Sequence, residues 1–314
     1  MVIKEIEEKS HLSKRCHLFL QETFSLLSFA NMNIDQQIDL LIKNALLEDI
    51  ADGDHSTLST IDPHTEGKAV LKIKQDGILA GMQVAEKIFR HMQQDIVFTA
   101  FKKDGEAMKY GEQAFEVKAK VHTILQCERL VLNCMQRMSG IATLTHSYVE
   151  KLAGYKTRLL DTRKTTPNFR VLEKEAVRIG GAVNHRFGLY DMIMLKDNHI
   201  DYCGGIKNAI EKAYNYVQTI KPGLKIEVET RSIADVETVM QTGKIDRIML
   251  DNFTPELIAE ALKIINGKYE TEASGGINFT NLESYAATGV DYISSGAIIH
   301  QAVSLDLSLK AVTI

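Results

Sequence analysis

The spacing of apolar and polar residues follows two patterns along this chain, and the change from one pattern to the other divides the chain into two parts. From residue 33 to about residue 48, apolar side chains recur at three- and four-residue spacing, which predicts an amphipathic helix. Residues 67–121 show short alternating runs between glycines, typical of strands, interrupted by one helix at 82–92. A long helix is predicted over 123–152, with a break near Ser139-Gly140. Together these elements predict an α+β module.

In the second half, short apolar segments alternate regularly with helical ones. The predicted strands are 158–160, 192–195, 225–228, 247–250, 270–273 and 291–294. The helices predicted between them are 172–179, 206–220, 233–242, 255–265 and 278–288. Serial alternation of strand and helix is typical of a parallel sheet or a βα barrel.

A polar group or a glycine turn follows each predicted strand. The groups are Asp161/Arg163/Lys164, Lys196/Asp197/Asn198, Glu229, Asp251/Asn252, Ser274/Gly275/Gly276 and Ser294/Ser295/Gly296. Any one of them could be a helix N-cap. In a βα barrel, however, the active site is built from loops at the carboxyl ends of the strands. Six groups in series therefore favour one convergent site.

The charge distribution indicates a small anionic ligand. The whole chain carries a formal net charge of -4, and its pI near 6.2 argues against a general nucleic-acid binder. Yet Arg163, Arg186 and Lys196 gather beside Thr-Thr-Pro and Gly-Gly runs. A solvated, salt-bridged helix face is the alternative, but these neighbours are loop residues. Guanidinium forks and an ammonium group in loops suit carboxylates or phosphates.

The last two glycine turns suggest where a phosphate binds. Phosphate commonly lies in the loops after the final two strands of a βα barrel, held by backbone N–H groups at helix starts. Glu229 and Asp251 form an anionic side that would hold Mg²⁺ or hydrogen-bond sugar hydroxyls. The site is therefore predicted to bind a phosphate, a polyol and Mg²⁺ together with a carboxylate-bearing anion. These are the groups that an enzyme of phosphoribosyl transfer must bind.

Specific motifs give the chain a family resemblance. They are 161–167 (DTRKTTP), 184–186 (NHR), 188–191 (GLYD), 196–199 (KDNH), 250–252 (LDN), 274–276 (SGG) and 128–129 (ER) before 136–143 (QRMSGIAT). With them, the chain resembles the quinolinate phosphoribosyltransferases, also called nicotinate-nucleotide pyrophosphorylases (carboxylating), from about residue 33 onward. Asn168 departs from the family, which usually has glycine there, but asparagine tolerates a left-handed backbone.

The resemblance implies an α/β fold with an N-terminal α+β sandwich domain and an incomplete parallel βα barrel. The expected division is an N-terminal extension at 1–32, the sandwich at 33–143, the barrel at 144–304, and a tail at 305–314 that packs back on the first domain. It also implies a homodimer, or a higher oligomer, in which Arg129 reaches the active site across the interface.

The reaction implied joins quinolinate and phosphoribosyl pyrophosphate, with Mg²⁺, to give nicotinate mononucleotide, pyrophosphate and CO₂ for NAD biosynthesis. Lys164, Glu229 and Asp251 are expected to be catalytic, and Glu229 and Asp251 to face the ribose and the metal, directly or through substrate. The expected quinolinate ligands are Arg129, Arg163, Lys164, His185, Arg186 and Lys196. The expected ligands of the 5'-phosphate are Ser274, Gly275, Gly276, Ser294, Ser295, Gly296 and Ala297.

Other functions and sites remain as alternatives. A paralogous branch associated with molybdenum transport, or a non-catalytic anion or nucleotide sensor, would use a similar pocket.

The acidic segment 48–54 lacks the spacing of a calcium loop and is expected to be a plain turn. No stretch approaches the ~20 apolar residues that span a bilayer. Four cysteines without CxxC spacing suggest reduced thiols and a cytoplasmic enzyme. The first thirty residues suggest an amphipathic helix or loose extension rather than a cleaved signal.

Overall fold

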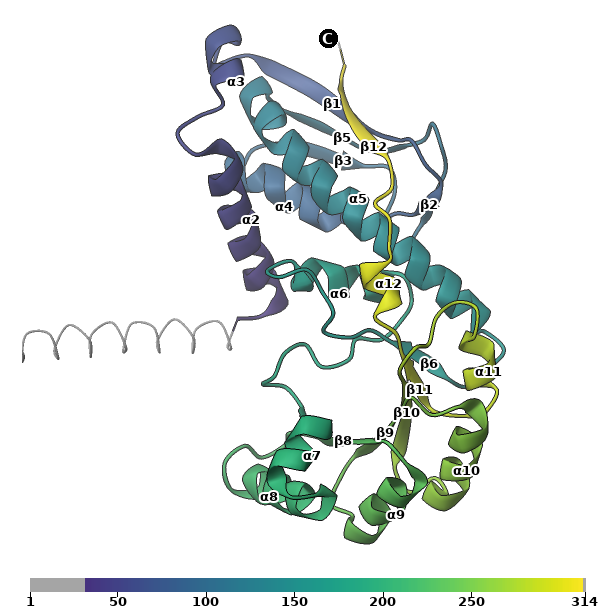
Figure 1. Cartoon of the computed structure of the whole chain (residues 1–314). Coiled ribbons are helices and arrows are strands. Elements are labelled where there is room, and N and C mark those ends of the chain that lie inside the picture. Colours follow the sequence, from purple (N-terminus) through teal and green to yellow (C-terminus); the bar gives the residue numbers. More distant parts are fainter. Residues whose placement is uncertain (1–31, 313–314) are drawn as a thin grey trace, which may run out of the picture.

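The N-terminal part of the chain is a curved antiparallel sheet covered by helices (Figure 1). The computed structural model describes residues 32–312, so the predicted N-terminal extension lies outside it except for residue 32. The sheet has the order β12-β1-β5-β3, and a short pair, β2-β4, lies beside it. The strands are β1 (Glu66–Ile73), β2 (Gly77–Ile78), β3 (Val97–Ala100), β4 (Ala107–Met108), β5 (Gln113–Lys120) and β12 (Leu307–Ala311).

Helix α2 (Ile34–Ile50) packs against α4 (Met82–Met92) and α5 (Val121–Lys151), which cover this sheet. The first begins at a capping box, in which Asn33 accepts the backbone N–H of Gln36 at 2.9 Å. Its buried positions, Ile38, Ile42 and Leu46, lie four residues apart, as the sequence pattern predicts. The helix continues to Ile50, past the residue where the pattern ends.

A short helix that the pattern does not predict, α3 (His55–Thr60), follows the acidic segment. Asp54 is its N-cap and accepts the backbone N–H of Thr57 at 3.1 Å. The carboxylate of Asp54 therefore caps a helix, and the acidic segment before it is a turn.

Helix α5 is continuous, so the predicted break near Ser139-Gly140 is wrong. Ser139 accepts the backbone N–H of Ala80 at 3.0 Å, and a Cβ at position 140 would collide with the backbone carbonyl of Val303. The glycine is thus a point of close approach inside a helix, and its intrinsic cost of about 1 kcal/mol is offset by packing. The predicted domain boundary at 143 falls within this helix.

The barrel part contains a six-stranded parallel sheet of order β6-β11-β10-β9-β8-β7. Its strands are β6 (Arg158–Leu160), β7 (Ile193–Leu195), β8 (Ile226–Thr230), β9 (Arg247–Asp251), β10 (Glu270–Ser274) and β11 (Tyr292–Ser294). No pairing joins β6 to β7 in this sheet, so the barrel is open there. The predicted fold class, an incomplete parallel barrel after an α+β domain, is confirmed.

Helices connect the parallel strands in the order the sequence predicts. They are α6 (Arg170–Ile179), α7 (Asp197–Cys203), α8 (Ile206–Thr219), α9 (Ile233–Thr242), α10 (Pro255–Ile265) and α11 (Leu282–Ala286). Helix α12 (Ala297–His300) follows the last parallel strand and leads to β12. The last predicted helix, 278–288, begins late because the side chain of Asn278 accepts the N–H of Thr280 at 2.9 Å and forms a turn instead. Helix α7 was not predicted, since its sequence is typical of a loop.

The two parts meet through α5 and the C-terminal tail. The tail leaves the barrel after α12, and β12 then pairs antiparallel with β1 (Figure 1). Helices α6 and α12 lie between the two sheets (Figure 1) and both contact α5. Among residues 32–312, no helix is long and apolar enough to cross a membrane.

Candidate active site

A cavity of about 780 Å³ lies at the carboxyl ends of the parallel strands. Because neighbouring parallel strands end at one edge of the sheet, the groups that follow them converge there. The predicted residues that line the cavity are Arg163, Lys164, His185, Arg186, Lys196, Asp251, Ser274, Gly275, Gly276, Ser294, Ser295, Gly296 and Ala297. Glu229 and Arg129, by contrast, do not line it.

Two glycine turns form one wall of the cavity. Gly275 and Gly276 have φ values of +93° and +64°, which favour glycine. A Cβ on Gly275 would also collide with Asn252, whose amide donates to Asp251 at 2.6 Å. Ser295 donates to the carbonyl of Ile277 at 2.9 Å and so joins the two turns. The wall is therefore narrow, and backbone rather than side chains faces the ligand space.

Lys164 lies over the second of these turns. A Cβ on Gly296 would come within 2.9 Å of the Lys164 Cδ atom. Among the described residues, no hydrogen bond or ion pair holds the ammonium group of Lys164 or the guanidinium group of Arg163. Both cations are thus available to an anion in the cavity.

The loop that follows Lys164 has the left-handed backbone conformation expected at Asn168. Asn168 has a φ of +61°, in the left-handed region, so the asparagine that replaces the usual glycine preserves the turn.

Arg186 provides a third cation. Its guanidinium group donates to the carbonyl of Met192 at 3.1 Å. Burial, followed by the neighbouring charge of Arg163, lowers its pKa. Two arginines that repel each other at a half-buried position are stabilised by a bound anion, so the geometry favours a carboxylate or phosphate ligand between them.

Two carboxylates lie at the carboxyl ends of neighbouring strands: Glu229 is the last residue but one of β8, and Asp251 is the last residue of β9. Glu229 is only 6% exposed and accepts Lys196 Nζ at 2.6 Å and the backbone N–H of Asp197 at 3.3 Å. Burial and the charge of Glu229 raise the pKa of Asp251. The pair therefore attracts a cation, and Lys196 is the cation that lies there in this structure.

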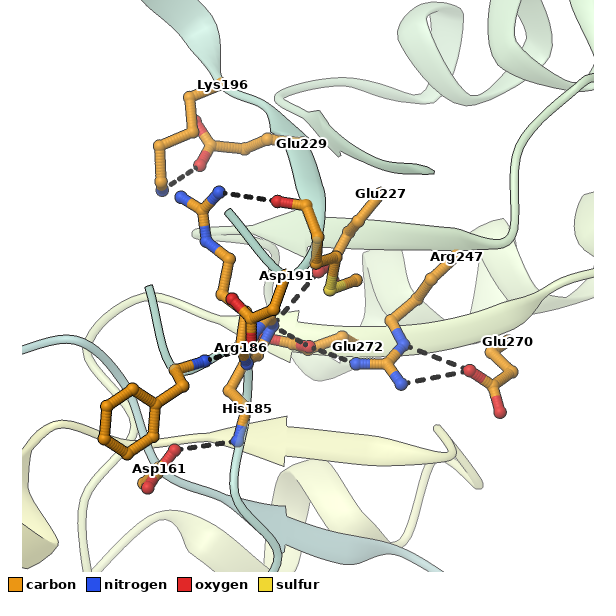
Figure 2. A network of polar contacts seen from close by, with 12 residues as sticks. Asp161, His185, Arg186, Asp191, Lys196, Glu227, Glu229, Arg247, Glu270 and Glu272 are labelled. Carbon is orange, nitrogen blue, oxygen red and sulfur yellow. Dashed lines mark hydrogen bonds and ion pairs between the residues drawn. The ribbon is translucent and has the colours of Figure 1, made fainter. Parts of the chain in front are cut away.

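Beneath the cavity, a cluster of charges surrounds His185 (Figure 2). Its backbone N–H donates to Asp161 at 2.7 Å, and Asp161 accepts Lys174 Nζ at 2.6 Å. Burial raises the pKa of Asp161 to about 6, although Lys174 opposes the shift. Val183, two residues before His185, also forms a parallel bridge with Leu160 of β6. The Asn184-His-Arg run is therefore anchored at a strand end rather than in a free glycine loop.

The ring of His185, which the sequence predicts to contact quinolinate, belongs to the cavity lining, and both of its nitrogens lie close to protein groups. Nδ1 accepts the backbone N–H of Arg186 at 2.6 Å, while Nε2 lies 3.0 Å from Glu227 and 3.1 Å from Glu272. Only the faces and carbons of the ring remain for a ligand.

Glu227 and Glu272, both completely buried, are functional candidates that sequence reasoning missed. They lie inside predicted strands, two residues before Glu229 and Ser274, and residues two apart share a face of a strand. That spacing was the available signal: a charged residue on the barrel-facing side of an apolar strand.

Arg129 lies on α5, is exposed, and belongs to no part of the cavity wall. Within one chain it does not join the other cations.

Known proteins resemble both parts of the chain. Residues 54–139 match the family model for the quinolinate phosphoribosyl transferase N-terminal domain, and residues 141–310 match that for its C-terminal domain. The quinolinate phosphoribosyltransferase (decarboxylating) 1b of Nicotiana tabacum is 42% identical over 285 residues, which cover 86% of this chain and 81% of that protein. The probable nicotinate-nucleotide pyrophosphorylase (carboxylating) of Synechocystis sp. is 40% identical, covering 88% and 92%. The crystal structure of NadC from Streptococcus pyogenes superposes with a TM-score of 0.82 at 41% identity, covering 88% and 98%.

Proposed function

This chain belongs to the quinolinate phosphoribosyltransferase family, and we propose that its cavity transfers the phosphoribosyl group of phosphoribosyl pyrophosphate to quinolinate with loss of CO₂. The products are nicotinate mononucleotide, pyrophosphate and CO₂, in NAD biosynthesis. One observation carries this proposal beyond the resemblance. A single cavity joins free cations on one side to two glycine turns and an acidic strand end on the other.

The cationic side is assigned to quinolinate. Arg163, Lys164 and Arg186 line the cavity, and quinolinate is a dianion whose carboxylates accept bidentate hydrogen bonds from guanidinium groups. Lys196 lies at the border between the two halves, because it pairs with Glu229 and also lines the cavity. His185 contributes through the position it gives to Arg186 rather than through a free ring nitrogen.

The glycine turns are assigned to the 5'-phosphate, which their backbone lets approach closely. Asp251 and Glu229 then face the ribose hydroxyls. The two carboxylates also fit Mg²⁺, since they supply hard oxygen ligands and the charge of Glu229 already raises the pKa of Asp251. When bound with the substrate, Mg²⁺ neutralises charge on the pyrophosphate leaving group. Glu229 takes part only if Lys196 moves away from it.

Catalysis in this arrangement is positioning and charge stabilisation. As the bond between ribose C1 and pyrophosphate breaks, the carboxylates stabilise the cationic sugar, and the pyridine nitrogen of quinolinate attacks C1. The new pyridinium withdraws electrons from C2, so the C2 carboxylate leaves as CO₂ and its electron pair remains on C2. A proton from water then completes nicotinate mononucleotide. None of these steps needs a covalent nucleophile from the protein.

The proposed assembly is a homodimer in which Arg129 of the partner subunit completes the cationic side. The exposure of Arg129 on α5 and its absence from the cavity wall of its own chain support this arrangement. The proposed location is the cytoplasm, which agrees with the free thiols of Cys127, Cys134 and Cys203.

Product analysis tests the proposed function. Purified protein is incubated with quinolinate labelled in its C2 carboxylate, phosphoribosyl pyrophosphate and Mg²⁺, and released CO₂ and nicotinate mononucleotide are measured. We expect equal amounts of both, none without phosphoribosyl pyrophosphate, and almost none with Lys164→Ala. Binding of either substrate without any product would favour the anion-sensor alternative. Turnover of another acceptor in place of quinolinate would favour the branch associated with molybdenum transport.

A further inference from the structure

Below the quinolinate side of the cavity, a buried acidic pair has no assigned role. Glu227 on β8 and Glu272 on β10 are both 0% exposed, and each places a carboxylate oxygen near His185 Nε2 (Figure 2). Arg247 pairs with Glu272 at 3.1 Å and, on its outer side, with Glu270 at 3.0 Å. Burying two carboxylates costs several kcal/mol unless partners compensate it. Such a cluster therefore calls for a specific function.

The hydrogen bonds determine which tautomer His185 adopts. Nδ1 accepts the backbone N–H of Arg186 at 2.6 Å, and accepting requires a lone pair. The ring proton consequently lies on Nε2, which is 3.0 Å from Glu227 and 3.1 Å from Glu272. Those carboxylates raise the pKa of His185 to about 9 despite its burial, but a second proton on Nδ1 would oppose the N–H of Arg186.

The contacts continue from this pair to the substrate side. The ring orientation set at Nε2 lets Nδ1 hold the backbone of Arg186, while Asp161 holds the backbone of His185. The guanidinium group of Arg186 then reaches up toward Lys196 and Glu229 (Figure 2). Its own donor contact in the structure, to the carbonyl of Met192, leaves further N–H groups for an anion.

The same three ligand atoms, from His185, Glu227 and Glu272, lie within 4.8 Å of one another and resemble a metal site. Charge argues against one. Arg247 already contributes a cation to Glu272, and the neutral Nδ1 acceptor leaves Nε2 protonated and unable to ligate. The cluster is thus better explained as a support for His185.

We propose that Glu227 and Glu272 are positioning residues that fix the Nε2–H tautomer and orientation of His185, and through it aim Arg186 at the carboxylate of quinolinate. The proposal rests on the proposed function for the identity of the ligand. It assigns the pair to quinolinate, because the contacts of Glu227 and Glu272 lead through His185 to Arg186. Glu272 also lines the cavity and hydrogen-bonds Ser294 of the second glycine turn, so Glu227 gives the more selective test.

The kinetic test uses Glu227→Gln and Glu272→Gln, with Glu270→Gln as the matched control. The control residue contacts the same Arg247 but has a side chain 41% exposed. We expect both buried variants to raise the KM for quinolinate on the order of tenfold or more. For Glu227→Gln, the KM for phosphoribosyl pyrophosphate should stay within about twofold, as expected for a ligand whose contacts are untouched. The control should match the parent protein in both values. Equal effects on both substrates, or lower thermal stability with unchanged quinolinate KM, would overturn the proposal.

A second measurement does not depend on turnover. Nitrogen NMR of the parent protein labelled at histidine reports the tautomer of His185, assigned by comparison with His185→Gln. We expect a neutral Nε2–H ring near neutral pH, and an Nδ1–H ring would refute the proposal. Metal analysis of the same sample should find no tightly held ion; a stoichiometric ion lost in Glu272→Gln would overturn it as well. If the tautomer is as expected but no product forms, the proposed function fails and the positioning inference stands.

Discussion

At the scale of single residues, Asp251 and Glu229 show how much an acidic site depends on its neighbours. Each ends a parallel strand, and Glu229 is neutralised here by Lys196 at 2.6 Å. A bare carboxylate beside a polyphosphate is repulsive unless a cation or a sugar hydroxyl intervenes. The two acids should therefore respond to Mg²⁺ and ribose rather than to quinolinate.

Asp251→Asn tests this division of the site. The amide keeps hydrogen-bonding ability but attracts no metal, so kcat/KM for phosphoribosyl pyrophosphate should fall by roughly a hundredfold. Quinolinate binding should change little. Calorimetry of each substrate, with and without Mg²⁺, measures both effects. Weakened quinolinate binding together with an unchanged Mg²⁺ dependence would show that the assignment is wrong.

Lys196 should act on the ligand and contribute little to stability. Its side chain is 44% exposed, and the buried Glu229 would keep the backbone N–H of Asp197, so Lys196→Ala should lower the free energy of unfolding by at most about 1 kcal/mol. The KM for quinolinate should rise roughly 10- to 100-fold, which corresponds to a charged hydrogen bond of about 1.5–3 kcal/mol. Denaturant unfolding and steady-state kinetics give the two values. A loss of several kcal/mol with normal kinetics would instead identify Lys196 as a structural partner of Glu229.

At the scale of elements, one buried ion pair joins both halves of the site. Arg137 on α5 donates to Glu173 on α6 at 2.9 Å and to the carbonyls of Ile299 and Ala302 around α12 at 2.9 and 2.7 Å. The Glu173 carboxylate, completely buried, also accepts the backbone N–H of Thr166 at 2.8 Å. The loop that carries Lys164 and the helix after the second glycine turn are thus held by a single pair.

Glu173→Gln should therefore affect stability and both substrates together. Removing one partner of a buried pair costs about 3 kcal/mol or more, and both KM values should rise because both loops lose their support. Glu175→Gln is the control on the same helix, since its partner Arg178 is 64% exposed and their ion pair should contribute at most about 1 kcal/mol. Urea unfolding and the two KM values measure the outcome. A change confined to one substrate would contradict a shared support.

At the scale of the whole molecule, the position of Arg129 predicts a shared active site. Arg129 is exposed on α5 and does not line its own cavity. Arg129→Ala and Lys164→Ala should each be nearly inactive alone. In a random mixture that exchanges subunits, half of the dimers are mixed and each has one complete site, so roughly a quarter of full activity should return. Absence of recovery in verified mixed dimers would count against a site built by two subunits.

Many features of this molecule can be predicted from the sequence because they depend on residues close together in the chain. The periods of 3.6 and 2 in the apolar residues identify the helices and strands, and α4, α9 and α10 have the predicted bounds. Polar residues that follow apolar strands identify the cavity side chains, because every parallel strand ends at the same edge. Arg163, Lys196 and Asp251 were found in this way.

The sequence by itself determined the serial βα order, the edge where the charges gather and the family of the protein. Only the tertiary structure decided how those charges are paired. Lys196 pairs with Glu229, 33 residues further along the chain, and Nε2 of His185 lies beside Glu227 and Glu272 while the residue also lines the cavity. The continuity of α5 through Gly140 likewise depends on the return of the chain at Val303. Such pairings follow from strand register and from the cost of leaving a buried charge or backbone group without a partner, and both are set by residues distant in the chain.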